Sequence, residues 1–270
     1  MPVQPMTLND GRTMPQLGFG LWEVQDAARV TREALEVGYR MADGAALYGN
    51  ERECGEGLRA SGVPRDEVFV TTKVWNDRHG EEEALQSVRE SLGRLGLDRV
   101  DLALIHWPSP RQGRFVEAWR GLIRAQEEGL ATSIGVSNFR PEDLDRIVDE
   151  TGVVPVLNQI ELHPELPQDE LRAKHREMGI VTQSWTPLGK SRTFDSPVIQ
   201  GIAGRTGASP AQVVIAWHLH LGLAVIPRST NRERLAENLA AAEVEITDED
   251  AAAIATLETG YRSGPDPSTF

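Results

Sequence analysis

The chain has 270 residues with 28 Lys and Arg against 41 Asp and Glu, which gives a formal net charge of −13. This excess of acid argues against a nucleic acid or an anionic membrane surface as the main partner. The length suffices for one large domain with a full core, and the composition is that of a globular protein. A single cysteine, Cys54, excludes an internal disulfide framework and a thiolate metal cluster.

No apolar stretch approaches the length that crosses a bilayer, and residues 1–20 lack the basic and apolar regions of a secretory signal. We therefore expect a cytoplasmic protein. Only three cations are lysines, Lys73, Lys174 and Lys190, and the chain uses arginine elsewhere. A lysine in such a chain indicates a specific need for a primary amine.

Short apolar or β-branched runs alternate with amphipathic helical segments from about residue 17 to residue 240. A hairpin in residues 1–15, turning at Asn9-Asp10-Gly11, precedes them, and residues 259–270 are expected to form an irregular tail. Strands are predicted at 17–20, 39–43, 68–72, 100–105, 131–136, 153–157, 180–184 and 223–226. Helices are predicted from the Asp26 cap to Gly38, from about Asn50, at 84–95, at 115–128, from Pro141, at 168–178, twice between 185 and 222, and at 231–239.

Eight strand–helix units in about 250 residues predict an α/β fold, a (β/α)₈ TIM barrel with an N-terminal β-hairpin and extra helices. A doubly wound open sheet is the alternative, but it usually has five or six strands and a glycine turn directly after a strand. The G-x-G-x-x-A match at Gly55 to Ala60 lies inside a predicted helix, so we interpret it as chance. No linker divides residues 1–270, which we expect to form a single domain.

In a parallel barrel the residues that follow the strands surround one mouth. Asp43, Tyr48, Lys73 and His106 stand at the ends of the second, third and fourth predicted strands or in the loops behind them. A buried carboxylate can orient an ammonium, the ammonium favours a phenolate, and a neutral imidazole can hold a carbonyl oxygen. Each residue alone has an ordinary structural explanation, but their joint placement favours a general acid with its partners.

A second cluster lies near the end of the pattern, where Arg228, Arg232 and Arg234 stand at a predicted helix N-terminus. A helix start favours an anion, and arginine adds bidentate phosphate recognition. The alternative is a solvated helix face balanced by neighbouring glutamates.

Segments 38–51, 70–76 (VTTKVWN), 102–108 (LALIHWP), 133–139, 157–164, 184–189 (SWTPLG) and 226–238 resemble the aldo-keto reductase superfamily, in the same order and over nearly the whole chain. The resemblance is strongest to the bacterial 2,5-diketo-D-gluconate reductase-like branch. It implies an NADPH-dependent carbonyl reductase that is monomeric, holds no metal and acts on a small-molecule carbonyl substrate.

The resemblance also implies roles for individual residues. Tyr48 would be the proton donor, Lys73 and Asp43 its tuning pair, and His106 the group that orients the carbonyl. Ser137, Asn138 and Gln159 would bind the nicotinamide carboxamide, with Trp185 stacked on its ring. The other residues implied for the cofactor are Thr186, Pro187, Leu188 and Gly189 at the pyrophosphate, Arg228, Ser229, Thr230 and Arg234 at the 2′-phosphate, and Glu237 and Asn238 near the adenine. Trp22, Trp75, His106 and Trp107 would wall the substrate pocket.

The chain departs from the family pattern at Gly44, where a hydroxyl residue is usual, and at Asn231, where a basic residue is frequent. The family's frequent lysine is Arg228 here. Two other functions stay open at this stage: a Schiff-base lyase that uses Lys73, and an NADPH-binding regulatory module with weak turnover. Because the segments after His106 and after the last helix are short, we expect an open mouth that accepts carbonyls of several sizes.

Overall fold

The computed structural model describes residues 5–270, so residues 1–4 of the predicted hairpin lie outside the described residues. The strands are β1 Pro5–Thr7, β2 Thr13–Pro15, β3 Phe19–Gly20, β4 Met41–Asp43, β5 Phe69–Val74, β6 Val100–Ile105, β7 Ala131–Ser137, β8 Leu157–Glu161, β9 Val181–Trp185 and β10 Ala224–Val225. The helices are α1 Ala27–Val37, α2 Glu51–Ala60, α3 Glu81–Leu95, α4 Phe115–Glu127, α5 Pro141–Thr151, α6 Asp169–Met178, α7 Pro197–Thr206, α8 Pro210–His220, α9 Arg232–Ala240 and α10 Asp248–Ala255.

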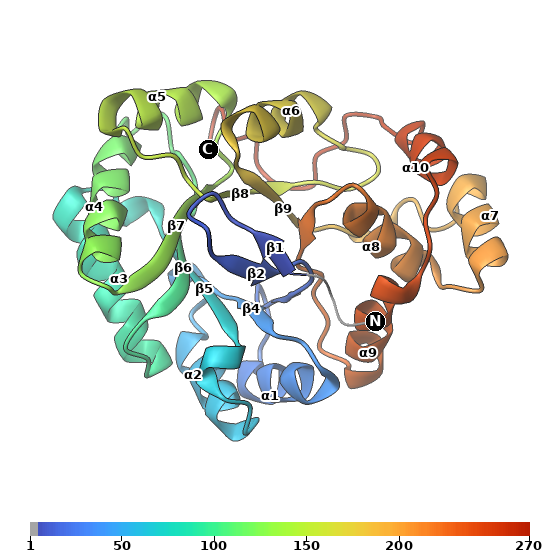
Figure 1. Ribbon diagram of the computed structural model, residues 1–270, viewed down its shortest axis with the longest axis horizontal. Helices are drawn as coiled ribbons and strands as arrows, with labels where there is room; N and C mark the ends of the chain where they lie inside the picture. The colour runs from blue at the N-terminus through green and yellow to red at the C-terminus, as the bar shows by residue number, and fades with distance from the viewer. Residues whose placement is uncertain (1–4) are drawn as a thin grey trace.

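Strands β3 to β10 form one parallel sheet in which each strand neighbours the next strand along the chain. The two edges of this sheet meet, because Leu17 bridges to Val225 and the Gly18 N–H donates to the Val225 carbonyl at 2.9 Å. Helices surround the strands in a ring (Figure 1). The predicted (β/α)₈ barrel is therefore confirmed, and the open-sheet alternative is wrong.

One predicted strand is misplaced. The run 153–157 was expected to pair, but β8 covers Leu157–Glu161 instead. Pro155 has no N–H to donate to a ladder, and pairing with β7 begins only after it, where the Val156 N–H donates to the Ile134 carbonyl at 3.0 Å. Asn158 and Gln159 consequently lie within a strand rather than after it, and all residues of β8 are buried.

The N-terminal hairpin closes one end of the barrel. Strands β1 and β2 pair antiparallel, and Gly11 turns the chain between them with φ +81°. The hairpin crosses the centre of the ring of strands (Figure 1). Its side chains Leu8 and Met14 pack in one buried cluster with Met41 and Leu157 from the barrel strands. The hairpin is thus an apolar plug, and the turn predicted at residues 9–11 is confirmed.

The strand period sends polar side chains to the opposite end. Side chains alternate between the two faces of a strand, so a residue two positions after an interior residue faces the interior as well. Met41 and Leu157 pack inside the barrel, which places Asp43 and Gln159 on the same inner face, closer to the carboxyl ends of the strands. The local pattern therefore brings polar groups from several strands to one mouth.

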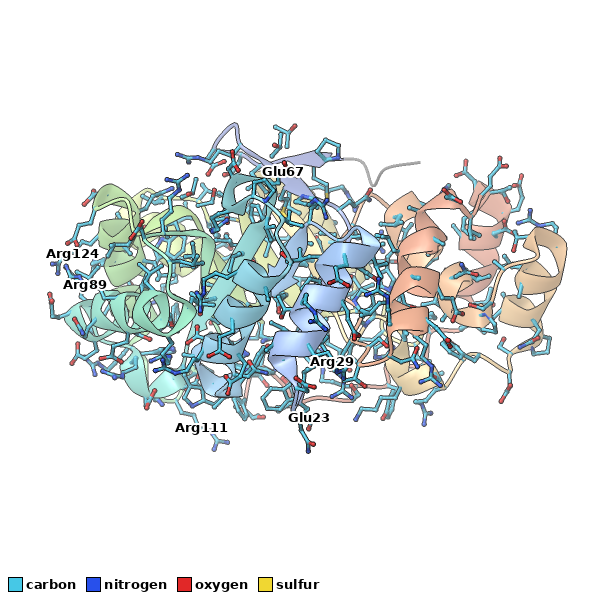
Figure 2. The ribbon with its side chains drawn as sticks, turned by 90° about the horizontal axis from the view of Figure 1, so that it is seen from below. Glu23, Arg29, Glu67, Arg89, Arg111 and Arg124 are labelled. Carbon is cyan, nitrogen blue, oxygen red and sulfur yellow. The ribbon has the colours of Figure 1, made fainter. Side chains whose placement is uncertain are left out.

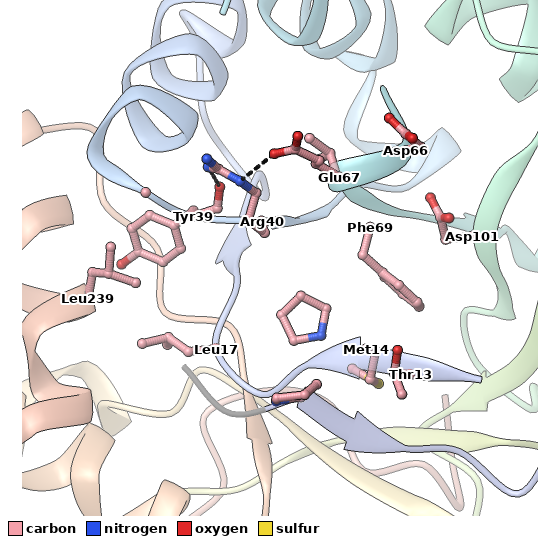
Figure 3. A pocket seen from close by; sticks show the side chains of 14 residues that line it. Thr13, Met14, Leu17, Tyr39, Arg40, Asp66, Glu67, Phe69, Asp101 and Leu239 are labelled. Carbon is pink, nitrogen blue, oxygen red and sulfur yellow. Dashed lines mark hydrogen bonds and ion pairs between the residues drawn. The ribbon is translucent and has the colours of Figure 1, made fainter. Parts of the chain in front are cut away.

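The two ends of the barrel differ in what they hold. Glu23 and Arg111, which follow β3 and β6, lie at one end, and Glu67, which precedes β5, lies at the other (Figure 2). A cavity at the Glu67 end is lined by Met14, Tyr39 and Arg40, among others, and Arg40 pairs there with Glu67 at 3.8 Å (Figure 3). None of the predicted site residues lines this cavity. None of the helices within residues 5–270 is long and apolar enough to cross a membrane.

The G-x-G-x-x-A match lies within α2, and its glycines allow close helix packing. A Cβ on Gly55 would come within 2.0 Å of the Leu95 carbonyl oxygen, and one on Gly57 within 2.4 Å of the Ala28 carbonyl oxygen. Both neighbours are backbone atoms, which cannot move aside cheaply. The two glycines therefore allow α2 to pack closely against its neighbouring helices. The position of the match inside a helix agrees with the interpretation that the match arose by chance.

We predict that Gly57→Ala lowers the free energy of unfolding by about 1–3 kcal/mol, because the added methyl overpacks the contact with α1. The matched control is Gly93→Ala, since Gly93 also lies inside a helix but a Cβ there meets no atom within 4 Å. That substitution raises stability by about 0.5–1 kcal/mol. Urea unfolding of both variants checks the pair, and equal effects at the two sites would contradict the packing argument.

Candidate active site

Lys73 on β5 is the centre of the site. Its side chain is fully buried, and its Nζ donates to Asp43 Oδ2 at 2.5 Å, to the Gly44 carbonyl at 2.9 Å and to the Tyr48 hydroxyl oxygen at 3.1 Å. An ammonium has three hydrogens, so these three acceptors use all of them. The Tyr48 hydroxyl accepts from Lys73 and therefore keeps its own hydrogen for a group in the cavity.

The charge states follow from burial and from these contacts. Burial lowers the pKa of Lys73, but the Asp43 carboxylate and the Tyr48 hydroxyl outweigh it, and the pKa stays above its usual value. Burial raises the pKa of the Tyr48 phenol, and the nearby Lys73 ammonium only reduces this rise. The sequence-based expectation that the ammonium favours a phenolate is thus outweighed by burial, and Tyr48 is protonated at neutral pH.

His106, which follows β6, faces the same cavity. Its ring lies edge-on to Tyr48 with centroids 5.6 Å apart and edge-on to Trp75 at 5.0 Å. Burial lowers the pKa of His106 well below its usual value, and the charge of Lys73 lowers it further. The imidazole is therefore neutral. It has one N–H group that can donate a hydrogen bond, but no extra proton to give up as an acid.

A layer of buried amides supports the carboxylate. Gln159 on β8 donates from Nε2 to Asp43 Oδ1 and to Gln183 Oε1, both at 2.7 Å. Asn138 has φ +63° and donates from Nδ2 to the His106 carbonyl and to Ser137 Oγ, both at 3.0 Å. Gln183 was not predicted. It lies two residues before Trp185 on β9, and because residues two apart in a strand share a face, the sequence could have indicated that both face the barrel interior.

Asp43, Tyr48 and His106 line one cavity of about 570 Å³, a size typical of small-molecule sites, and Lys73 lies buried behind them. The predicted wall residues Trp22, Trp75, His106 and Trp107 all line it, as do Ser137, Asn138, Gln159, Trp185, Thr186, Pro187 and Leu188. Gly189 does not, because it packs behind the loop against the His163 ring.

Residues 259–270, which we call the C-terminal segment, also shape this cavity. They form no helix or strand, as predicted, but Ser263, Gly264, Pro265 and Phe270 line the mouth. The Phe270 ring lies 4.6 Å from that of Trp107 and 6.0 Å from that of Trp75. The expectation of an open mouth did not include the C-terminal segment as part of the cavity wall, because no sequence pattern indicates where an irregular segment packs. Lys190 and Leu47 line the cavity too and were not predicted.

A groove continues from the cavity to the start of α9. The two hollows share Glu23, Leu188, Ser191 and Arg228, so a single long ligand can occupy both. The predicted residues Arg228, Ser229, Thr230, Arg234, Glu237 and Asn238 line the groove. Asn231, where relatives often have a cation, caps α9 by accepting from the Arg234 N–H at 2.9 Å.

The three arginines of the cluster differ in their partners. Arg228 donates from Nη1 to Glu23 Oε2 at 2.9 Å and to the Trp22 carbonyl at 3.1 Å, across the lip between cavity and groove. Arg232 is paired with Glu36 at 2.5 Å and does not line the groove. Within residues 5–270, Arg234 has no carboxylate partner, so its charge is available to an anion in the groove.

Fold and site together are those of an enzyme: a closed parallel barrel with buried ionisable groups at its mouth and a groove that continues from the cavity. Residues 16–259 match the aldo/keto reductase family. An aldo-keto reductase of Mycolicibacterium smegmatis is 48% identical over 98% of this chain and 97% of its own length. The methylglyoxal reductase DkgA of Escherichia coli is 47% identical over 97% of this chain and 96% of its own length.

Solved structures agree with this result. A Brucella melitensis aldo/keto reductase has a TM-score of 0.93 and 45% identity, over 96% of this chain and 99% of its own. A mutant of Gox0644 in complex with NADPH has a TM-score of 0.96 and 45% identity, over 100% of this chain and 99% of its own. The chain belongs to the aldo/keto reductase family and is an oxidoreductase of that family. The family predicted from the sequence is confirmed.

We predict that His106 stays neutral as the pH is lowered from 8 through 6.5, the usual pKa of histidine. The unfolded chain takes up this proton near pH 6.5 and the folded chain does not, so His106 reduces stability as the pH falls below about 6.5. An NMR titration of its ring C2 proton, assigned by its loss in His106→Gln, should show no step in this range. A midpoint near 6.5 would contradict the neutral imidazole.

Proposed function

We propose that residues 1–270 act as a single aldo-keto reductase domain that reduces an aldehyde or ketone with NADPH, with Tyr48 as the proton donor. The observation that supports this proposal most is that the Lys73 ammonium donates all three of its hydrogens, one of them to the Tyr48 hydroxyl oxygen. The hydroxyl hydrogen of Tyr48 is then free to be donated to a ligand in the cavity. Bound NADPH supplies the hydride that goes directly to the carbonyl carbon. The chain supplies position, charge and the proton.

The shape and charge of the site fit this cofactor. An elongated ligand with an anionic end matches a cavity that continues into a groove with the unpaired Arg234. We assign the 2′-phosphate to Arg228, Ser229, Thr230 and Arg234, the adenine to Glu237 and Asn238, and the pyrophosphate to the loop 186–189. Ser137, Asn138 and Gln159 hold the carboxamide, and Trp185 stacks on the nicotinamide ring.

The proton transfer follows from the four central side chains. The neutral His106 donates a hydrogen bond to the carbonyl oxygen and keeps it near the Tyr48 hydroxyl. As negative charge develops on that oxygen, Tyr48 donates its proton, and the adjacent Lys73 stabilises the phenolate that forms. Asp43, held by Gln159, keeps Lys73 charged and in place.

The lyase alternative is not favoured. A Schiff base requires a neutral amine that can reach the substrate. Lys73 is charged, fully buried and bonded to three acceptors. No contact of the described residues favours a regulatory module over an enzyme. That the protein is a monomer in the cytoplasm stays a prediction.

The walls of the cavity indicate the substrate class. Trp22, Trp75, Trp107 and Phe270 offer apolar faces. We propose small uncharged carbonyls as substrates, with methylglyoxal as the first to test, because several relatives are named as methylglyoxal reductases.

Tyr48→Phe should lower kcat by a factor of about 10²–10⁴, the usual contribution of general acid catalysis, while NADPH still binds. Steady-state turnover of methylglyoxal, followed at the absorbance of NADPH, gives kcat, and calorimetry gives the affinity. An unchanged kcat would defeat the assignment of Tyr48. Trapping with borohydride provides the complementary check, since a covalent adduct on Lys73 would support the lyase instead.

Arg234→Ala should weaken NADPH binding roughly tenfold and leave NADH binding unchanged, because the lost charge-assisted hydrogen bond serves only the 2′-phosphate. Arg232→Ala is the matched control, since Arg232 lies two positions away and pairs with Glu36 outside the groove. Calorimetric titration of each variant with both dinucleotides provides the measurement. An equal loss for NADPH and NADH, or an equal effect of the two substitutions, would contradict the assignment.

A further inference from the structure

The last residue of β8, Glu161, is a carboxylate in an unusual place. It is fully buried and yet lies outside the group of Asp43, Lys73 and Tyr48. A buried carboxylate is costly unless it is well hydrogen-bonded.

Glu161 holds the C-terminal segment by its backbone. Its Oε1 accepts from the Ser263 N–H at 2.5 Å, and its Oε2 accepts from the Gly264 N–H at 3.1 Å. His163 Nε2 lies 3.1 Å from Oε1, and Arg262 Nη1 lies 3.9 Å from Oε2. Burial raises the pKa of Glu161, but these hydrogen bonds outweigh it and the pKa lies below its usual value. The group is therefore a carboxylate at neutral pH.

The segment held in this way touches Trp185. A Cβ on Gly264 would lie 2.5 Å from Trp185 Cη2 and 3.2 Å from Cζ3, so Gly264 rests directly on the outer edge of the indole. The backbone of Gly264 does not need glycine for its φ angle, because its φ lies outside the left-handed range. The close approach to the ring is what excludes a side chain.

Trp185 is thus fixed at both ends. Its Nε1 donates to Asn138 Oδ1 at 2.8 Å, and the opposite edge lies under Gly264. In the sheet, Trp185 and Glu161 are register partners on β9 and β8. The Glu161 carboxylate therefore fixes the distance between Gly264 and the Trp185 indole, and Trp185 is the neighbour of Glu161 in the sheet.

We infer that Glu161 is a positioning residue for the cofactor: through Ser263 and Gly264 it fixes the Trp185 indole against which the nicotinamide ring stacks. This inference rests on the proposed function, because it takes the stacking role of Trp185 from it. The C-terminal segment then does more than cover the mouth, since its anchor determines where the hydride donor lies relative to Tyr48. A misplacement of about 1 Å at such a point can cost a hundredfold in rate.

The test uses two substitutions that disturb the indole in opposite ways. Glu161→Gln removes the carboxylate, so one of the two N–H groups loses its acceptor and the segment lifts from the ring. Gly264→Ala keeps the carboxylate and pushes a methyl group against the ring, although the added Cβ also lies 3.3 Å from Glu161 Oε2. Both should weaken NADPH binding and lower kcat roughly tenfold to a hundredfold. Both should also shift the ¹⁹F resonance of Trp185 in the 5-fluorotryptophan-labelled protein without cofactor, assigned by its loss in Trp185→Phe.

Glu165→Gln is the matched control. Glu165 anchors the same segment at its start, where its backbone carbonyl accepts from the Thr259 and Gly260 N–H groups and its carboxylate binds Arg192. Its described contacts do not include Trp185. Glu165→Gln should leave the Trp185 resonance and the NADPH affinity unchanged. Equal effects of the substitutions at 161 and 165 would reduce Glu161 to general support of the segment and overturn the inference.

A double-mutant cycle separates positioning from simple destabilisation. Phenylalanine lacks the outer ring atoms Cη2 and Cζ3, so in the Trp185→Phe background the methyl of Gly264→Ala has room on the side of the ring, and of the three nearest atoms only Glu161 Oε2 at 3.3 Å remains. Gly264→Ala should therefore have little further effect on NADPH affinity in that background. Additive losses would overturn the inference. If wild-type protein neither binds nor oxidises NADPH, the proposed function itself fails, whereas normal turnover with an unperturbed Trp185 resonance in both variants defeats only the role of Glu161.

Discussion

A buried ammonium is the constraint on which the site depends. Removing Lys73 from water costs several kcal/mol, and only full hydrogen bonding in good geometry compensates for this. The register of β4 and β5 provides that geometry: it pairs Asp43 with Thr71, so Lys73 follows two residues further along the same face of β5, and its long side chain reaches Asp43 Oδ2. Gln159 then donates to the carboxylate from across the interior, and Gln183 accepts from Gln159. A barrel that had to maximise stability alone would place apolar side chains here, so the arrangement indicates chemistry.

The sequence predicted the barrel, and it predicted that Asp43, Tyr48, Lys73 and His106 lie close together, because both rest on local, periodic signals. Strands and helices alternate visibly, and polar residues such as Lys73 and His106 interrupt apolar runs where strands end. It failed where position depends on distant contacts. The strand β8 begins after Pro155, although the residues on either side of this proline are β-branched. No local sequence pattern predicts that Phe270 packs on Trp107. Gly44 lacks the side-chain hydroxyl that is usual at this position of the family. Its backbone carbonyl nevertheless accepts a hydrogen bond from Lys73.

The charges of the protein are arranged to leave little positive charge unpaired at the groove. In a chain of net charge −13, most described arginines near this groove have acidic partners, as Arg228 and Arg232 do. Arg234 differs because the N-cap Asn231 accepts from its backbone N–H, and among the described residues no carboxylate pairs with its guanidinium. An acidic protein repels anions over most of its surface, and one unpaired arginine beside a helix N-terminus then gives an anionic ligand a single preferred place.

Precise placement of a flat ring needs directional contacts as well as packing. Apolar surfaces such as the Trp107 and Phe270 rings exclude water, but they allow an irregular segment to slide, because the attraction depends on area and hardly on direction. Two successive N–H groups bound to one carboxylate allow only one height and one orientation of the Ser263–Gly264 backbone. A glycine at the point of contact then transfers that height to the indole without an intervening side chain. The costly burial of Glu161 is therefore explained by position rather than by stability.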